Sequence, residues 1–338
     1  MTRTPATLRE TPWHVDILVS DGFVLIEVAA IVDVIRIANR VSAQPVFTWG
    51  YCSAHGGPIE SRCRAFVNTD PYVDRPTADY AFVIGNSNPD APALSLSSVI
   101  NAYTYRNARV FLLAEAASRY IAEHPNAELA HTTHWENSAL LRERTGVFDA
   151  RNTIATQHGS VVTCAGMGAT IDIALSVVGQ HISAAATMTV ADIFLHEKIR
   201  DFASLQPFSG LKSTATGDRE LDKCLDLMQA NIEEPLPIQT IVASIGISNR
   251  SLERKFRAHL NTTPNTYYRE LRLAKANNLL LNTSLSVREI GMACGFSSGF
   301  SGLYKSFYKI TPAVMRRQRR QGPDAPSNSA PNSAPETT

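Results

Sequence analysis

The stretch SIGISNRSLERKFRAHL, residues 244–260, carries the pattern that decides the fold of the carboxyl-terminal part of the chain. Leu252, Phe256 and Leu260 follow one another at four-residue spacing, so at about 100° per residue they share one face of a helix. The opposite face carries three arginines: Arg250, Arg254 and Arg257. The stretch therefore predicts an amphipathic helix with an apolar stripe for a core and a basic stripe outside it.

The outline of this stretch recurs in CGFSSGFSGLYKSFYKI, residues 294–310. A shift of 49 residues places Gly246 on Gly295, and a shift of 48 residues places Pro264 on Pro312. Each copy predicts a short helix, a turn at the glycine, a second helix and a proline at the boundary. That arrangement is a helix-turn-helix, the unit that places its second helix in the major groove of DNA.

Two such copies, joined by an amphipathic helix at residues 267–281, indicate DNA binding. A single copy would be explained more simply as an ordinary helix with a solvated face. Arginine pairs bidentately with guanine and also binds phosphates, so the first copy suits base recognition. The predicted DNA-binding residues of this copy are Ser248, Asn249, Arg250, Ser251, Arg254, Lys255 and Arg257.

The second copy offers fewer groups on its outer face, namely Ser298, Gly302 and Lys305. Gly299 and Gly302 would each weaken its helix by about 1 kcal/mol relative to alanine. We therefore expect the first unit to contact bases and the second mostly to hold phosphates. The predicted DNA-binding residues of this copy are Ser297, Ser298, Ser301 and Lys305.

The charge of the chain is divided unevenly along its length. Residues 1–217 hold 16 Lys and Arg against 20 Asp and Glu, whereas residues 218–320 hold 16 against 9. Such asymmetry suggests a nucleic acid or another anionic partner for the basic part. A basic domain that is merely well solvated is the alternative on charge alone.

The front of the chain alternates between two kinds of hydrophobic pattern. Strand-like apolar runs occupy residues 13–20, 46–53, 80–85, 108–114 and 160–164. Helical patterns occupy residues 25–41, 94–106, 135–144, 169–181 and 187–202, the last as a closing helix. The fold class we predict is therefore α/β, with a doubly wound, mainly parallel amino-terminal sheet followed by an all-α domain with two helix-turn-helix units.

Composition predicts the domain boundaries and the cellular compartment. We expect an amino-terminal domain at 12–203, a Ser/Thr/Gly/Pro-rich linker at 204–218, a DNA-binding domain at 219–320 and a disordered tail at 321–338. The five cysteines form no CxxC pair, which argues against disulfides or a zinc site and fits a reducing cytoplasm. We expect no metal, no cofactor, no signal peptide and no membrane span.

The carboxyl-terminal segment resembles the AraC/XylS-type DNA-binding domain, from IVASIGISNRSLERKFRAHL through GMACGFSS to YKSFYKITP. That family has two helix-turn-helix units bridged by a helix. The resemblance implies a sequence-specific transcription regulator, with double-stranded DNA and RNA polymerase as partners. One departure is that the second unit, after Gly299, is shorter than such domains usually are.

The front part resembles a class I glutamine amidotransferase-like domain of the PfpI type, in DGFVLIEVAAIVDVIRIAN, SAHGGPIESRCRAFVNTD, HTTHWE and TCAGMGATIDIALSVV. Regulators with this pairing, similar also in VADIFLHEKIRD, respond to amino acids and quaternary ammonium metabolites such as arginine, carnitine and betaine. The resemblance thus implies a small-metabolite effector, whose identity stays open.

Enzymes of the amidotransferase-like fold carry a nucleophilic cysteine on a strained turn after a central strand, with a histidine nearby. That turn falls near Ala114-Glu115, or near Asn107 in an alternative registration, and neither place holds a cysteine. Ser118 is the nearest hydroxyl but lacks an elbow motif. We therefore expect no catalytic residue and interpret His134 as a pocket or core residue, and Cys164 as a buried thiol.

Three hypotheses compete: a ligand-sensing regulator, an enzyme fused to a DNA-binding module, and a DNA-binding protein whose front domain only dimerises. The missing cysteine disfavours the enzyme, while the sequence leaves the other two open. We predict a regulator that acts as a homodimer and is an activator, because two-fold-related sites gain affinity from a linked second contact.

Four loops are expected beyond the carboxyl ends of the strands, where a doubly wound sheet binds ligands. Phe23 and Trp135 would offer ring faces to a cationic nitrogen, an interaction of about 2 kcal/mol when desolvated, and Glu115 would offset its charge. The alternative is that both rings only pack in the hydrophobic core. We predict a small cationic or zwitterionic ligand bound by Phe23, Asn86, Ser87, Glu115, His134 and Trp135.

Overall fold

The computed structural model describes residues 11–42, 45–126, 130–145, 152–206 and 216–320. The chain divides into two compact units, residues 1–212 and 213–338, and each is described here by itself. Most of the predicted linker, residues 207–215, and the predicted tail, residues 321–338, lie outside the described residues. Among the described helices, none has both the length and the apolar character needed to cross a bilayer.

The amino-terminal unit is built on one sheet with the strand order β3-β4-β2-β1-β5-β6-β8-β7. The pairs at the two edges, β3 with β4 and β7 with β8, are antiparallel, and the other neighbours are parallel. The strands are β1 (Trp13–Leu18), β2 (Phe47–Ser53), β3 (Gly57–Glu60), β4 (Phe66–Pro71), β5 (Tyr80–Val83), β6 (Arg109–Leu113), β7 (Ala155–His158) and β8 (Val161–Cys164).

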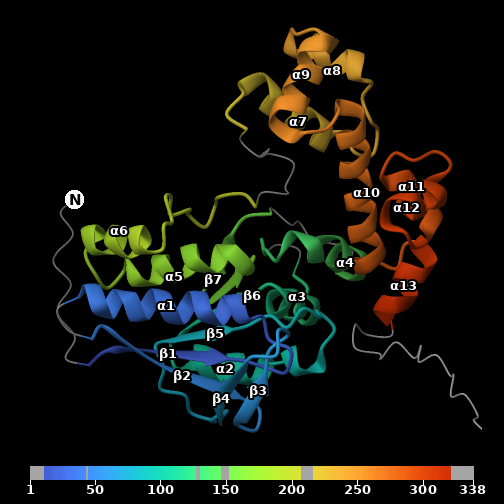
Figure 1. Cartoon of the computed structure of the whole chain (residues 1–338). Helices are drawn as coiled ribbons and strands as arrows, with labels where there is room; N and C mark the ends of the chain where they lie inside the picture. Colours follow the sequence, from blue (N-terminus) through green and yellow to red (C-terminus); the bar gives the residue numbers. More distant parts are fainter. Residues whose placement is uncertain (1–10, 43–44, 127–129, 146–151, 207–215, 321–338) are drawn as a thin grey trace, which may run out of the picture. The chain divides into compact units, whose positions relative to one another are not determined.

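Helices cover both faces of this sheet (Figure 1). In β6, Phe111 and Leu113 join one core with α1, α5 and α6, whereas Val110 and Leu112 join a second core with α2 and α3. This alternation is what a buried central strand requires. The helices are α1 (Leu25–Val41), α2 (Ser97–Tyr105), α3 (Glu115–Glu123), α4 (Trp135–Thr145), α5 (Thr170–Val178) and α6 (Ala184–Ile193), with short 3₁₀ turns at Pro92–Leu94 and Met167–Ala169.

The predicted fold class is confirmed, but the closing helix at 187–202 is wrong in extent. Helix α6 ends at Ile193, and Leu195 has a φ of +53°, which a continuing right-handed helix cannot accommodate. The chain then runs back along the sheet edge, where Ile154 N donates to Ser204 O and Gln206 N donates to Asn152 O. Residues 204–206, assigned to the linker on composition, are thus bound to the amino-terminal unit.

The carboxyl-terminal unit consists of helices and contains both predicted helix-turn-helix motifs, α8–α9 and α11–α12, bridged by α10. A left-handed glycine ends the first helix of each motif, because Gly246 has a φ of +82° and Gly295 a φ of +71°. The helices are α7 (Arg219–Ala230), α8 (Ile238–Ile245), α9 (Asn249–Leu260), α10 (Pro264–Asn282), α11 (Val287–Ala293), α12 (Phe300–Tyr308) and α13 (Pro312–Arg320).

The two motifs differ at the start of their second helices. Helix α9 begins right after its cap, Ser248, whose hydroxyl accepts from Ser251 N at 3.1 Å. Helix α12 begins only at Phe300, the counterpart of Leu252, so it lacks the first turn of α9. Gly299 lies before α12 with a φ of +71°, where glycine is favoured, so the predicted helix-weakening cost does not apply to it.

Arg272 joins the bridging helix to the second motif. Its Nε donates to Cys294 O at 2.8 Å and its Nη2 to Gly295 O at 2.5 Å. Its guanidinium carbon also lies 4.2 Å from the centre of the Phe296 ring. The side chain therefore donates to carbonyl groups that the end of α11 leaves without a helical partner. It also fixes the turn that precedes α12.

Candidate functional site: a basic helix surface and a separate cavity

The outer face of α9 forms an open hollow of about 570 Å³. Its lining residues are Ser248, Arg250, Ser251, Glu253, Arg254 and Arg257. Leu252 and Phe256 on the other face are fully buried among α7, α8 and α10, so the helix cannot rotate and its arginines stay outside. This arrangement presents a rigid row of guanidinium groups, which suits phosphates and the guanine edge.

Lys255 does not belong to this exposed row. Its Nζ binds the Asp218 carboxylate and lies 3.1 Å from Glu220 Oε2, both at the start of α7. Asp218 also caps that helix by accepting from Glu220 N and Leu221 N. Lys255 therefore fastens α9 to α7, and the pairing explains why its side chain is turned away from the hollow.

The corresponding surface of the second motif is weakly charged. Ser297, Ser298, Ser301 and Lys305 are exposed, whereas Phe300 and Tyr304 are buried in its core. The hydroxyl of Tyr304 donates to Asn277 Oδ1 at 2.5 Å, which holds α12 against α10. One lysine and three hydroxyls can bind phosphate oxygens, but they offer no bidentate base contact.

In the amino-terminal unit, a strained turn follows β6. Ala114 has a φ of 43° and a ψ of −108° and lies between β6 and α3. This is the position of the predicted nucleophile turn, so the registration on Ala114 is confirmed and that on Asn107, which precedes β6, is wrong. A methyl group stands where a thiol would be needed, and it cannot attack a carbonyl.

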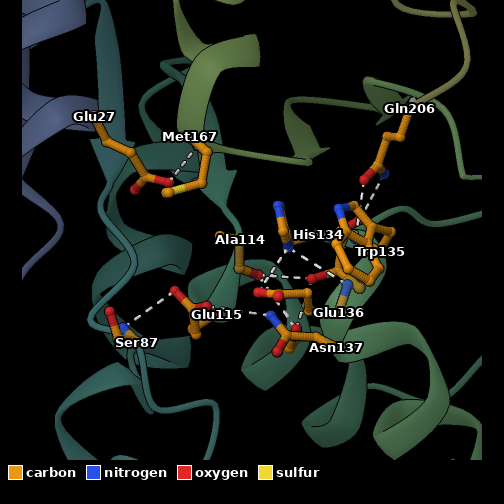
Figure 2. A network of polar contacts seen from close by, with 12 residues as sticks. Glu27, Ser87, Ala114, Glu115, His134, Trp135, Glu136, Asn137, Met167 and Gln206 are labelled. Carbon is orange, nitrogen blue, oxygen red and sulfur yellow. Dashed lines mark hydrogen bonds and ion pairs between the residues drawn. The ribbon is translucent and has the colours of Figure 1, made fainter. Parts of the chain in front are cut away.

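Glu27 lies close to this turn and joins the ends of two strands. Its carboxyl oxygens accept from Gly85 N at 2.9 Å and from Met167 N at 2.8 Å (Figure 2). Burial of the side chain raises the pKa of Glu27 to about 8, so the carboxyl is mostly protonated at neutral pH. A Cβ added at Gly166 would lie 2.8 Å from the Ala114 Cβ, so the segment around Gly166 packs closely against the strained turn.

Glu115 makes a second set of contacts next to the strained turn (Figure 2). Its carboxylate accepts from Ser87 N at 3.3 Å and from Asn137 Nδ2 at 3.3 Å. The hydroxyl of Thr133 donates to Ala114 O at 2.8 Å and accepts from the hydroxyl of Ser118 at 2.6 Å. These contacts tie α3 and α4 to the strained turn, so the hydroxyl of Ser118 serves structure.

A cavity of about 350 Å³ opens near the carboxyl end of β8. Its lining residues are His134, Trp135, Ile154, Ala165, Gly166, Met167, Gly168, Ala169, Arg200 and Gln206. Burial lowers the pKa of His134 to about 4, and its Nδ1 accepts from Glu136 N at 3.4 Å. The imidazole is therefore neutral and carries its proton on Nε2, which makes Nε2 a hydrogen-bond donor.

Arg200 is held in this wall by Asp172, which is only 1% exposed. The Asp172 carboxylate accepts from Arg200 Nη2 at 2.7 Å, Arg200 Nε at 3.0 Å and Arg200 N at 2.7 Å. His196 Nε2 lies 2.9 Å from the same carboxylate. Four donors thus surround Asp172, and the arginine is fixed in one orientation.

Gln206 anchors the loop that carries the cavity aromatics (Figure 2). Its Oε1 accepts from Trp135 N at 2.9 Å, and its Nε2 donates to Thr133 O at 2.7 Å and Thr153 O at 2.9 Å. The residue is 3% exposed, so these bonds are made away from water. The last described residues before the segment between the units therefore form one wall of the cavity.

Comparison with known proteins shows which proteins the chain is similar to. Residues 241–318 match the family described as a helix-turn-helix domain. The sequence is 27% identical to the HTH-type transcriptional regulator GbdR of Pseudomonas aeruginosa, over 92% of this chain and 85% of that protein. The chain is a transcription regulator whose carboxyl-terminal unit holds an AraC-type helix-turn-helix domain. The resemblance of the carboxyl-terminal segment to AraC-type domains is thereby confirmed over residues 241–318.

Two further relatives of this regulator differ in coverage. The HTH-type transcriptional regulator ArgR of P. aeruginosa is 37% identical over 56% of the regulator and 58% of that protein. The crystal structure of a transcriptional regulator from Chromobacterium violaceum, described by its AraC-type DNA-binding domain, is 48% identical and covers 32% of the regulator and 99% of that chain, with a TM-score of 0.31.

The structure brings together some of the predicted ligand residues and separates others. His134 and Trp135 line the cavity. Phe23 is fully buried in the core between the sheet and α1, so it has no ring face to offer a ligand. Asn86 is 6% exposed, and Ser87 and Glu115 bind each other rather than lining the cavity.

Sequence reasoning missed Arg200, Gln206 and the turn at residues 165–169 as parts of the cavity. Arg200 lay within the predicted closing helix, and Gln206 within the predicted linker. Two signals were available. The glycines of GMGAT directly follow a strand, and Asp172 interrupts an apolar helix, where a buried carboxylate requires a cationic partner.

Proposed function

We propose that this regulator senses a small metabolite, which binds in the cavity lined by His134, Trp135 and Arg200. The observation that carries the proposal is the position of Arg200 and Gln206, which line the cavity just before the segment leading to the DNA-binding unit. A ligand that alters this wall changes the anchoring of that segment. Coupling between effector and DNA needs such a shared element.

A reporter assay tests the proposal. Trp135→Ala should abolish the response of a promoter reporter to the effector and leave basal DNA binding unchanged, because Trp135 is in the cavity and not in the DNA-binding unit. Tyr105→Ala is the matched control, since that ring is 87% exposed at the end of α2. The effector itself is found by a thermal-shift screen of amino acids and methylated amines, where saturation at 100 times Kd adds roughly 2.7 kcal/mol.

Glu115→Gln gives a second comparison. We expected Glu115 to offset the charge of a bound cation, but its carboxylate binds Ser87 N and Asn137 Nδ2 instead. The variant should therefore shift stability while keeping the reporter response. A lost response in this variant, together with a normal response in Trp135→Ala, would move the binding site to the Glu115 network.

A second candidate function is a front domain that only dimerises. It is favoured if no compound raises the melting temperature and Trp135→Ala gives the same reporter output as the wild type. An amidotransferase-like activity is disfavoured, because Ala114 occupies the strained turn and Ser118 is buried under hydrogen bonds. Hydrolysis of a panel of amides and esters by the wild-type protein, lost on substitution of Ser118, would restore that alternative.

We also propose that the regulator acts as a homodimer and activates transcription through RNA polymerase. A single weakly charged second motif supplies few base contacts, so two linked protomers gain specificity from repeated sites. The expected footprint spans two half-sites separated by whole helical turns. Deletion of the gene should lower transcription of its target promoter; increased transcription would make the protein a repressor.

A further inference from the structure

We infer that the effector bears a carboxylate, which binds the guanidinium of Arg200 while its apolar part lies against Trp135. This inference deepens the proposed function and rests on it. It narrows the expectation of a cationic or zwitterionic ligand, because the charge that the cavity wall presents is positive. Among the described residues that line the cavity, Arg200 is charged and none is Asp or Glu.

The free hydrogen-bonding capacity of the wall supports an anion. A guanidinium has five N–H donors, and Asp172 takes one from Nε and one from Nη2. Within the described part of the chain, no partner is recorded for the donors on Nη1. Arg200 therefore retains an edge that can form charge-assisted hydrogen bonds to a carboxylate.

The carboxylate of Asp172 cannot serve a cationic ligand instead. Its two oxygens offer about four lone-pair sites, and four donors from Arg200 and His196 already occupy them. The side chain is also 1% exposed, so a ligand cannot reach it. Asp172 therefore acts as a positioning residue, which fixes the guanidinium before the ligand arrives.

The remaining walls suit a small molecule with an apolar portion. Trp135, Ile154 and Met167 contribute hydrophobic surface, and His134 contributes a neutral Nε2 donor. Residues 166–169 lead into the amino terminus of α5, whose partial positive charge also favours an anion. A volume of about 350 Å³ is at the lower end of ligand pockets, so the effector is expected to be metabolite-sized.

The test compares matched pairs of compounds on the wild-type full-length protein by thermal shift and calorimetry. Each pair consists of a carboxylate and the same skeleton without it, such as glycine betaine with choline or L-arginine with agmatine. We expect binders only among the carboxylate members. If choline or agmatine binds as tightly as its partner, the inference fails and the sensing function stands. If no member of any pair binds, the proposed function fails and the inference with it.

Variants locate the carboxylate. For a carboxylate found to bind, Arg200→Gln should weaken binding about tenfold or more, as loss of a charge-assisted hydrogen bond implies. Arg200→Lys should bind with intermediate affinity, because lysine keeps the positive charge but lacks the paired N–H donors of the planar guanidinium. Arg62→Gln, at an exposed arginine of the same unit, is the control. Because Arg200→Gln leaves Asp172 buried without its partner, Arg200→Gln/Asp172→Asn is measured beside it. Unchanged affinity in both folded variants would overturn the assignment.

Discussion

Lys255 on the second helix of the first motif binds Asp218, the residue that caps the amino terminus of α7. The contact converts a residue predicted to hold DNA into one that holds the domain together. It also means that the helix presenting the arginines is fastened to the point where the chain enters the carboxyl-terminal unit. On this helix, Lys255 is thus paired within the domain, whereas Arg250, Arg254 and Arg257 line the hollow proposed to bind DNA.

Lys255→Met should lower the free energy of unfolding of the carboxyl-terminal unit by less than about 1 kcal/mol, as is usual for a partly exposed ion pair. Asp218→Ala should lower it by about 1 kcal/mol more, because the helix cap is lost as well. Urea unfolding of the full chain measures both. Lys305→Met is the control and should leave stability unchanged while weakening DNA binding. Weaker DNA binding in a stable Lys255→Met protein would return Lys255 to the DNA-binding surface.

Arg254→Ala should relax base preference at one position of the binding site and cost about 1–3 kcal/mol of binding free energy. Its guanidinium lines the open hollow on α9, where it can reach a base edge. Lys305→Ala should weaken binding to all sequences about equally, because α12 lacks the counterpart of the first turn of α9, where residues predicted to contact bases lie. Competition binding against a randomised site distinguishes these outcomes, and an exchange of the two phenotypes would reverse the ranking of the motifs.

DNA affinity should fall steeply with salt. Each phosphate neutralised contributes about 0.9 log units of affinity per log unit of salt concentration. Arg250→Gln should reduce this slope by about one phosphate if Arg250 binds the backbone. Binding isotherms on one footprinted site, repeated across salt concentrations, provide the slope. A flat dependence for the wild type would contradict the proposed basic surface.

Glu27 should make the amino-terminal unit less stable as the pH rises. Its pKa is raised by burial from 4.5 to about 8 in the folded protein, so between these values the folded state binds more protons than the unfolded state. The stabilising contribution is fully present below pH 4.5 and is lost as the pH rises towards 8. Thermal unfolding across that range measures the slope.

Glu27→Gln removes the titrating group and should flatten this slope. Below pH 4.5 the variant should also be less stable than the wild type, since its amide nitrogen cannot replace one of the two oxygens that accept from Gly85 N and Met167 N. Glu60→Gln, at an exposed carboxylate of β3, serves as the control. An unchanged slope in the folded Glu27→Gln protein would show that other groups produce the pH dependence.

Elements with strong periodicity were predictable, and weakly patterned ones were not. Helix α1 matches its predicted residues, because a long apolar stripe at helical spacing has few alternatives. Strands β3 and β4 were missed because they lie at one end of the sheet and most of their residues are exposed. Helix α3 was missed because it starts immediately after β6, without the cap residue or polar turn that marks a helix start.

The two candidate sites also differed in how far the sequence could predict them. The surface on α9 lies within one helix, so residue spacing alone placed Arg250, Arg254 and Arg257 together. Lys255 shares that helix, but its partner at Asp218 lies in another one, which spacing cannot show. The cavity brings together residues 134–135, 154, 165–169, 200 and 206, and no local pattern links segments so far apart.

The wall formed by Arg200 and Gln206 has a consequence for the energetics of induction. If an effector at that wall changes the affinity for DNA by some factor, thermodynamic reciprocity requires DNA to change the affinity for the effector by the same factor. A metabolite titration of the free protein would then misstate the effector concentration at which the promoter responds. The concentration that matters is the one at which the promoter-bound protein is half saturated.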